Sequence, residues 1–320
     1  MDNLSDLRIL NIAVFLGGWS AEREISLISG NSVLTSLKKL GLKASGVDLK
    51  SKGDCKKNFE EFDLVFNALH GKGGEDGFIQ SILEEKNISF TGSKAVSSRI
   101  SFNKIETKKL WREMGLPTPD FVEIKNIKTP LMELNHFVSG DENIISLEKS
   151  FVVKPAREGS SFGISIVKPH EGSLEDAMEL ASKFDHDVLI EAFVDGTEMT
   201  VAILGEKTMP PITIFPANLF YDYESKYLSK KTRYEASKLT SDKKLEIQDL
   251  ALKAFTSLGC EGWGRVDFIQ DQENNFQIIE INTVPGLTET SLFPKAAAID
   301  GLEYDDLITE IIKTAFKDID

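Results

Sequence analysis

The sequence predicts an α/β protein with more than one domain, and three observations lead to that prediction. Roughly the first ninety residues alternate short apolar strands with amphipathic helices, the pattern of a parallel sheet covered by helices. The chain has 320 residues, which is more than a single hydrophobic core usually organises. Near the C-terminus, two strands flank the turn-rich stretch from Asp271 to Asn275, which predicts an antiparallel hairpin.

The N-terminal part of the chain carries the clearest alternation. Strands are expected at residues 9–16, 44–49, 64–69 and 88–90, and helices at 25–40 and 78–83. Gly17 and Gly18 turn the chain after the first strand, and Gly41 ends the first helix. Because ligands of parallel sheets gather at the carboxyl ends of the strands, the Gly-rich charged loops 17–24 and 70–77 form a candidate binding edge.

The rest of the chain continues with strands and helices separated by longer loops. Strands are expected at residues 121–124, 151–155, 164–167, 188–193 and 199–204, and helices at 104–114, 174–183, 244–258 and 304–316. Residues 126–149 show no recognisable pattern. The loop from Tyr221 to Arg233 is too long and too aromatic for a simple connector, so we expect it to act as a lid.

The composition excludes several classes of protein. Apolar residues make up 41% of the chain and charged residues 28%, which is typical of a soluble globular protein. No stretch approaches the roughly 20 apolar residues of a membrane span, and the N-terminus lacks the pattern of a signal peptide. Cys55 and Cys260 form no CxxC motif, which fits a reduced cytoplasmic protein. A net charge of −14 argues against a nucleic-acid partner but not against an anionic ligand in a basic cleft.

The C-terminal hairpin carries a candidate metal site. Glu280 and Asn282 are two residues apart on one strand, so their oxygens point to the same face. Asp267 on the partner strand adds a third hard oxygen ligand, a set that suits Mg²⁺ bound together with substrate phosphates. Arg265 can stabilise an anion beside the metal. Carboxylates on hairpins are often merely solvated. Taken alone, Asp267, Glu280 and Asn282 therefore support a metal site and a solvated surface equally.

Lys154 ends an apolar strand and precedes the Gly/Ser loop 157–163. Backbone N–H groups, hydroxyls and a lysine in such a loop can hold phosphate oxygens, although a solvated hairpin tip is the alternative. There is no GxxxxGK[ST] motif, no GxGxxG after the first strand and no nucleophile elbow. The first absence excludes a P-loop nucleotidase, and the second argues against a dinucleotide-dependent oxidoreductase. Without a nucleophile elbow, the sequence gives no support for covalent acyl chemistry. The acids of the Glu22–Glu24 stretch are explained equally well by the helix dipole.

Six segments, in order along the chain, resemble the D-alanine–D-alanine ligase family of the ATP-grasp superfamily. They are residues 16–26, 68–77, 153–161, 221–227, 262–267 and 280–294. The resemblance implies an N-terminal parallel α/β domain at 1–96, followed by two ATP-grasp subdomains, 97–193 and 194–320, that clamp the nucleotide. It implies ATP-dependent synthesis of D-alanyl-D-alanine through D-alanyl phosphate, for cytoplasmic peptidoglycan precursor synthesis. It also implies a homodimer, with D-alanine and ATP as small-molecule partners and no membrane or nucleic-acid partner.

The resemblance also implies a role for each matched residue. The nucleotide site would comprise Lys104, Lys154, Ser161, Glu191, Ala192, Val194, Glu198 and Lys226, with the strand at Glu191 meeting adenine largely through its backbone. Two Mg²⁺ or Mn²⁺ ions would be held by Asp267, Glu280 and Asn282. The first D-alanine would be bound by Glu22, hydrogen-bonded with Ser160 and Tyr227, with His70 nearby. Arg265 and the Gly286 N–H would bind the oxyanion, and Ser291 and the Leu292 N–H would bind the carboxylate of the second D-alanine.

Departures from the family pattern are small. Asn103 stands where the family usually has Asp, and Phe102 where Met is usual. A related ligase that uses D-lactate or D-serine as second substrate remains an alternative, although Tyr227 in its Tyr-Glu-Ser-Lys-Tyr context favours the dipeptide. A non-catalytic nucleotide-binding module is a second alternative. Such a module would tolerate the loss of Arg265 or Asn282, and both are present.

Overall fold

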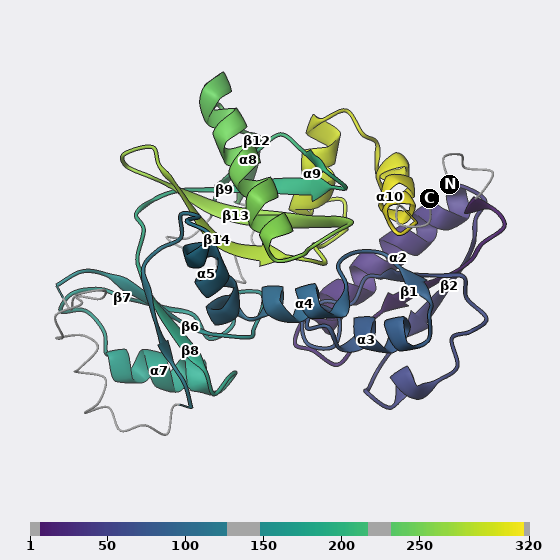
Figure 1. The fold of residues 1–320 in the computed structure, drawn as a ribbon, viewed down its shortest axis with the longest axis horizontal. Coiled ribbons are helices and arrows are strands. Elements are labelled where there is room, and N and C mark those ends of the chain that lie inside the picture. Colours follow the sequence, from purple (N-terminus) through teal and green to yellow (C-terminus); the bar gives the residue numbers. More distant parts are fainter. Residues whose placement is uncertain (1–6, 127–147, 217–231, 317–320) are drawn as a thin grey trace.

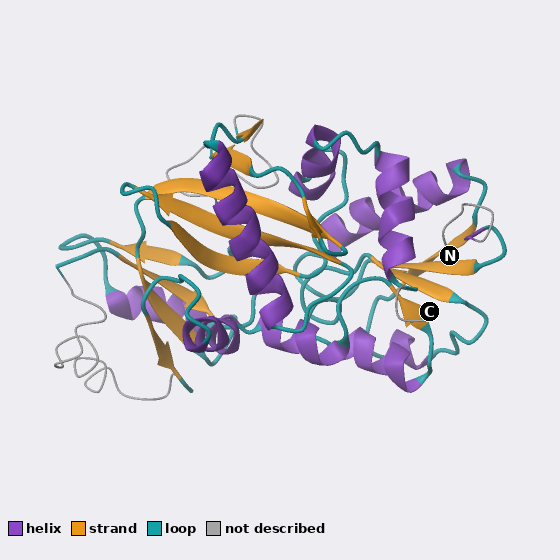
Figure 2. Cartoon of the chain, turned by 45° about the horizontal axis from the view of Figure 1, so that its top comes forward, coloured by secondary structure: helices purple, strands orange, loops and turns teal. Residues whose placement is uncertain are grey.

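The computed structural model describes residues 7–126, 148–216 and 232–316. Its strands form three sheets, drawn in Figures 1 and 2. Most of the segment without a sequence pattern, and residues 221–231 of the expected lid, lie outside the described residues. Within the described residues, no helix has the length and apolar character needed to cross a membrane.

The first sheet is parallel, as the sequence predicts, with the strand order β2-β1-β3-β4. Its strands are β1 (Asn11–Leu16), β2 (Lys43–Asp48), β3 (Leu64–Asn67) and β4 (Ser89–Phe90). They alternate with α2 (Arg23–Lys39), the 3-10 turn η1 (Asp54–Lys56) and α3 (Phe78–Glu85). Gly41 has φ +75°, a left-handed conformation that glycine adopts without strain, and this explains why α2 ends there.

The second sheet is antiparallel and has the order β5-β8-β6-β7. Its strands are β5 (Phe121–Ile124), β6 (Phe151–Pro155), β7 (Ser165–Val167) and β8 (Val188–Ala192), and α7 (Leu174–Ser182) packs on them. Val153 and Ile190 pair across the sheet and meet Met178 and Ala181 of α7 in a small core of their own.

The third sheet contains the predicted hairpin, β13 (Trp263–Asp271) and β14 (Phe276–Asn282). Its order is β12-β11-β9-β13-β14, with β10 paired to β9. The other strands are β9 (Gly196–Leu204), β10 (Lys207–Thr208), β11 (Ile212–Phe215) and β12 (Arg233–Ala236), and the helices are α8 (Ser241–Ser257), α9 (Leu292–Ile299) and α10 (Tyr304–Thr314). Asp267 lies directly opposite Glu280 in the register of the hairpin. The two predicted oxygen ligands therefore meet across the two strands.

The third sheet is packed against both other parts of the molecule. Figure 1 shows it between the parallel sheet on the right and the second sheet at lower left. Val14 and Phe66 of the parallel sheet share one core with Trp263 and Phe293 of the C-terminal region. On the other side, α4 (Ala95–Phe102) and α5 (Lys104–Glu113) pack on the third sheet and its helix α8. The Trp111 Nε1–H, for example, donates to the backbone oxygen of Ala254 at 3.1 Å.

Candidate active site

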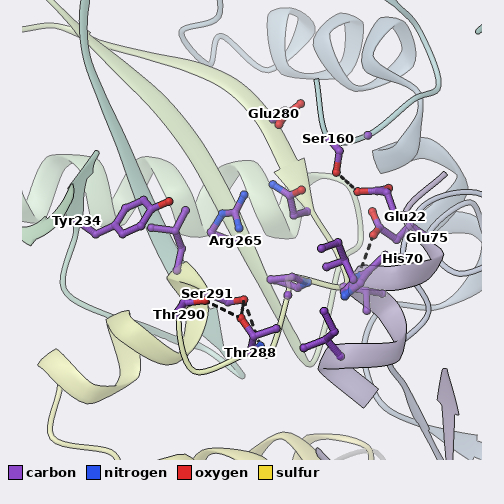
Figure 3. Close-up of a pocket in the computed structure, with 18 residues that line it drawn as sticks. Glu22, His70, Glu75, Ser160, Tyr234, Arg265, Glu280, Thr288, Thr290 and Ser291 are labelled. Atoms are coloured by element: carbon purple, nitrogen blue, oxygen red, sulfur yellow. Dashed lines mark hydrogen bonds and ion pairs between the residues drawn. The ribbon is translucent and has the colours of Figure 1, made fainter. Parts of the chain in front are cut away.

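Two cavities meet along β14, and all three sheets or their loops contribute to them. One cavity, of about 240 Å³, is lined by Glu22 and His70 from the parallel domain, Ser160 from the second sheet's loop, and Arg265 and Gly286 from the third region (Figure 3). The other, of about 160 Å³, lies between the second and third sheets. Glu280 lines both cavities, so they adjoin at this carboxylate.

Glu22 and Ser160 connect the parallel domain to the loop after β6. Glu22 is buried at the start of α2, and its Oε1 accepts a hydrogen bond from the Ser160 hydroxyl. Ser160 and Ser161 both have positive φ, 49° and 61°, which costs roughly 1–3 kcal/mol for each residue. A Cβ at Gly159 would lie 2.7 Å from Glu22 Oε2, so a larger residue there would displace the Glu22 carboxylate.

His70 lies in the loop after β3 and is buried. Its Nδ1 is 3.5 Å from Glu75 Oε1, and its Nε2 is 3.1 Å from the Ser29 hydroxyl of α2. The same hydroxyl oxygen accepts a hydrogen bond from the Leu287 N–H at 3.2 Å. His70 is thus connected through Ser29 to the loop that carries Gly286.

The loop from Val284 to Ser291 forms the far wall of the larger cavity. The hydroxyls of Thr288 and Ser291 are 2.7 Å apart, and the Thr288 N–H donates to Ser291 Oγ at 3.2 Å. Ser291 precedes α9, so the first N–H groups of that helix lie beside the cavity that Leu292 also lines. Helix N-termini favour carboxylates, which matches the role the sequence predicts for Ser291 and Leu292.

Arg265, Asp267 and Asn282 form a connected polar group on the hairpin. The Arg265 Nε–H and Nη2–H donate to the two Asp267 oxygens, both at 2.8 Å. The Asn282 Nδ2–H donates to Asp267 Oδ2 at 3.1 Å, and the Thr200 hydroxyl donates to Asp267 Oδ1 at 2.6 Å. The bidentate contact fixes the plane of the guanidinium, whose side chain lines the larger cavity.

The predicted metal ligands are adjacent, and their chemistry suits a hard cation. Within the described residues, no group of three His, Cys, Asp or Glu side chains is arranged to hold a metal ion. The predicted set differs in that it has two carboxylates and one amide, from Asp267, Glu280 and Asn282. Mg²⁺ commonly takes one or two protein carboxylates together with phosphate oxygens, so the chemistry of this donor set fits that ion.

The smaller cavity collects most of the residues predicted to bind a nucleotide. It is lined by Lys154, Ser161, Glu191, Ala192, Val194, Glu198, Asp267 and Glu280. Lys104 lies at the neighbouring end of Glu280, where its Nζ donates to the Glu158 backbone oxygen at 2.6 Å and is 3.7 Å from Glu280 Oε2. A cavity with apolar walls, a lysine and a Gly/Ser loop is the chemistry that a nucleoside phosphate requires.

Comparison with known proteins gives the family of the chain. The family model described as D-ala D-ala ligase C-terminus matches residues 110–313, and the one described as D-ala D-ala ligase N-terminus matches residues 42–93. A D-alanine--D-alanine ligase from Buchnera aphidicola subsp. Baizongia pistaciae (strain Bp) is 45% identical over 305 residues, which cover 95% of this chain and 97% of that protein. The chain belongs to the D-alanine–D-alanine ligase family.

Solved structures agree with this membership of the ligase family. The D-alanine--D-Alanine ligase from Bacillus anthracis has a TM-score of 0.84 at 33% identity, covering 96% of this chain and 98% of that chain. The same enzyme complexed with ATP has a TM-score of 0.81 at 30% identity, with the same coverage. VanG D-Ala:D-Ser ligase from Enterococcus faecalis has a TM-score of 0.81 at 26% identity, covering 95% and 98%. The predicted ATP-grasp ligase fold is therefore confirmed.

Some residues of this ligase site were not predicted, and others lie outside the described residues. Lys226 and Tyr227 belong to the latter group. Glu75 was missed although it falls in the segment 68–77, because its pairing with His70 is visible only in three dimensions. Tyr234 of β12 was also missed, and it lines the larger cavity from an edge strand that the sequence pattern did not reveal.

The most unexpected part of the ligase site is a buried group of three charges beside the smaller cavity. Glu191 pairs through Oε1 with Lys154 and through Oε2 with Lys108, the latter at 3.0 Å. Burial lowers the pKa of Lys108 to about 8, against the attraction of Glu191. Burial alone would raise the pKa of Glu191, but the two ammonium groups hold it below its usual range. The Glu191 side chain therefore makes two buried ion pairs, in addition to the adenine contact predicted for the backbone of its strand.

Proposed function

We propose that this protein joins two D-alanine molecules into D-alanyl-D-alanine, with ATP converted to ADP and phosphate. The observation that carries this proposal is the larger cavity. It combines an acid, Glu22, an arginine, Arg265, and a hydroxyl at a helix N-terminus, Ser291. These groups suit an ammonium group, an oxyanion and a carboxylate, which are the features of two amino acids being joined. The adjoining smaller cavity would supply the nucleotide.

In the first step, a carboxylate oxygen of the first D-alanine attacks the γ-phosphorus of ATP, and ADP leaves. The product is D-alanyl phosphate, which converts a poor electrophile into a reactive one. Lys154 and Lys104 would stabilise the phosphate charge, and positioning supplies much of the rate. Asp267, Glu280 and Asn282 would hold two Mg²⁺ or Mn²⁺ ions. When bound, such ions neutralise and orient the phosphate oxygens.

Glu22 would fix the first substrate by accepting hydrogen bonds from its ammonium group. The Ser160 hydroxyl bonded to Glu22 sets the orientation of that carboxylate, and Tyr227 is proposed to complete the set. His70 and Glu75 close the same side of the cavity. A buried carboxylate that keeps its position by hydrogen bonds is preorganised for a cation, so little energy is lost in reorganisation.

In the second step, the neutral amine of the second D-alanine attacks the acyl phosphate carbon. The carbonyl oxygen becomes an oxyanion, which Arg265 and the Gly286 N–H would stabilise. Collapse of the tetrahedral intermediate breaks the bond to the phosphate oxygen, and the departing phosphate can accept the proton that the nitrogen loses as the amide forms. Ser291 and the Leu292 N–H would hold the carboxylate of the second D-alanine and so aim its amine at the carbon.

The domain division and the cellular setting belong to the same proposal. The proposed units are 1–96, 97–193 and 194–320, and one sheet falls within each. A homodimer and a cytoplasmic location, where peptidoglycan precursors are made, are supported by family analogy. Analytical ultracentrifugation of the purified protein would test the dimer, and a monomer at micromolar concentration would reject it.

Phosphate release from ATP tests the activity. We expect release and a dipeptide product with D-alanine alone, and no release with L-alanine alone. D-alanine mixed with D-lactate or with D-serine tests the two related activities, the second because a D-Ala:D-Ser ligase shares the fold. A mixed product that outweighs D-alanyl-D-alanine at equal acceptor concentrations would replace the proposed second substrate. No phosphate release with any acceptor would favour a nucleotide-binding module.

A further inference from the structure

A buried lysine behind the nucleotide cavity has no role in the chemistry described above. We propose that Lys108 is a positioning residue that keeps Glu191 neutralised, so that Lys154 can turn from Glu191 to the nucleotide phosphates. This inference rests on the proposed function, because it takes Lys154 as a phosphate ligand. It adds a residue that touches no substrate and yet determines whether that ligand is available.

The location of Lys108 supports an indirect role. Its side chain is fully buried, with 0% exposure, and it lines none of the cavities near β14. It lies on α5, four residues after Lys104, so both lysines share one face of the helix. Lys104 reaches Glu280 at the metal end of the site, and Lys108 reaches Glu191 at the other end.

Lys108 has a second partner besides Glu191. Its Nζ donates to Thr118 Oγ1 at 2.6 Å, and the Thr118 hydroxyl donates to the backbone oxygen of Ile278 on β14 at 2.9 Å. The Ile278 N–H in turn donates to the Pro117 oxygen at 2.8 Å. Lys108 is therefore fixed to the third sheet, whereas Glu191 and Lys154 belong to the second.

The charges explain why a second lysine is needed. In this structure one carboxylate, Glu191, faces two ammonium groups, and both contacts are buried. If Lys154 moves to a phosphate, Glu191 keeps Lys108 as its partner and no buried charge is left alone. Without Lys108, the same movement would strand a buried carboxylate, which is a costly arrangement. Lys154 would then stay with Glu191, and phosphate binding would weaken.

The decisive measurement compares a ligand with phosphates and a ligand without them. Adenosine and ADP would be titrated against the full-length protein by competition with a fluorescent ADP derivative. The quantity of interest is the ratio of the adenosine Kd to the ADP Kd. Adenosine does not draw Lys154 from Glu191, so Lys108→Met should leave adenosine binding nearly unchanged. The same variant should reduce the ratio by roughly 10- to 100-fold.

Two further variants separate this role from a structural one. Lys109→Met is the matched control, because Lys109 is the next residue of α5, is partly exposed and pairs with Glu123 away from the cavity. It should leave the ratio unchanged. In a Glu191→Gln background, Lys108→Met should no longer change the ratio, because no carboxylate remains to be stranded. If Lys108→Met alone does not fold, comparing the Glu191→Gln protein with and without Lys108→Met provides the test.

The outcomes distinguish the inference from the proposed function. If the wild-type protein binds ADP no better than adenosine, Lys154 is not a phosphate ligand and the proposed nucleotide site fails. If the wild type prefers ADP and Lys108→Met keeps the same ratio, or weakens adenosine and ADP equally, the inference about Lys108 is wrong. The inference is also wrong if Lys108→Met still reduces the ratio in the Glu191→Gln background.

Discussion

Part of the polar lining of the two cavities is held by specific partners before any ligand arrives. Asp267 accepts from Arg265, Asn282 and Thr200. Such preorganisation reduces the reorganisation that a developing charge would otherwise require. Glu280 differs from these residues because it faces two cavities and lies 3.7 Å from Lys104. A single substitution there should affect metal, nucleotide and chemistry together.

Replacing Glu280 with Gln keeps its size and removes its charge. We expect kcat to fall on the order of 100-fold and the Mg²⁺ concentration for half-maximal activity to rise, since one charged ligand is lost. Phosphate release measured over a range of Mg²⁺ concentrations would show both effects. Glu273→Gln, at the exposed tip of the same hairpin, is the control and should behave as wild type. Full activity of the wild type in excess EDTA would refute the metal site.

The two cysteines should be unreactive in the folded protein. Burial raises the pKa of the Cys55 thiol and of the Cys260 thiol to about 11 in each case. Since the folded pKa is raised, the stability that the protonated thiols contribute is present below about pH 9 and lost as pH rises towards 11. At pH 8, we expect iodoacetamide to label neither thiol until urea is added. Mass spectrometry would detect this, and rapid labelling of native protein would contradict it.

At the scale of single elements, α5 does most to organise the site, because it presents both Lys104 and Lys108. Its N-terminus is capped by Asn103, whose side-chain oxygen accepts from the Ile105 N–H at 3.1 Å and the Glu106 N–H at 3.4 Å. The Asn103 amide also donates to Glu106 Oε1 at 2.9 Å. The bond to the Glu106 carboxylate gives a physical reason for Asn where the family usually has Asp, since an aspartate there would face a like charge.

Removing the cap should destabilise the protein. Asn103→Ala is expected to lower the free energy of unfolding by about 1 kcal/mol, because two N–H groups lose their acceptor. Asn103→Asp should lose less, since it keeps the acceptor, and its cost is limited to the lost bond to Glu106 and the like charge of that carboxylate. Urea midpoints of the three proteins would measure this order. An alanine variant as stable as wild type would mean that the cap is replaced by water at no cost.

Elements with strong periodicity could be predicted from the sequence, and those without it could not. The helix α2 and the hairpin β13–β14 were expected within a few residues, because their patterns span several turns or an obvious tight turn. By contrast, α4 reads Ala-Val-Ser-Ser-Arg-Ile-Ser-Phe and α9 begins Leu-Phe-Pro, so neither shows a clean apolar stripe. The strands β10, β11 and β12 have only two to four residues each, which is too short for a clear alternation of apolar and polar residues.

The residues of the candidate site were likewise predictable only where a local sequence pattern places them. Glu280 and Asn282 were expected on one face because a strand alternates its side chains, and both line the larger cavity. Lys108 could not be found in this way, since its partner Glu191 belongs to another element and only folding brings them together. The contact of Ser29 with His70 is likewise invisible in the sequence, because serines on helices are usually unremarkable.

At the scale of the whole molecule, the cores differ in size and in what they join. The parallel sheet and the third sheet share one continuous core, which includes Phe66 and Trp263 with ring centroids 6.2 Å apart. The second sheet has a small separate core around Val153 and Ile190. Because segments open according to the apolar surface that they bury, the second sheet should be the least protected part.

Hydrogen exchange would measure this difference. We expect amides of β6 and β8 to exchange at least about 10-fold faster than amides of β1 and β13, corresponding to an opening free energy lower by ~1.4 kcal/mol. ADP should slow β6 and β8 selectively, because the nucleotide is proposed to bind between them and the third sheet. Equal protection throughout the three sheets would indicate that the second sheet does not open independently.

The shared wall at Glu280 also bears on how the protein could be inhibited. A nucleotide fragment and a dipeptide-like fragment would occupy neighbouring cavities that are both lined by this carboxylate. Joining them through a short linker that passes Glu280 makes the second contact intramolecular, so the gain is set by effective concentration rather than by new contacts. We expect the joined compound to bind about 100-fold more tightly than the better fragment, which calorimetry would test. A bulky anionic linker should forfeit this gain, because it would meet the Glu280 charge.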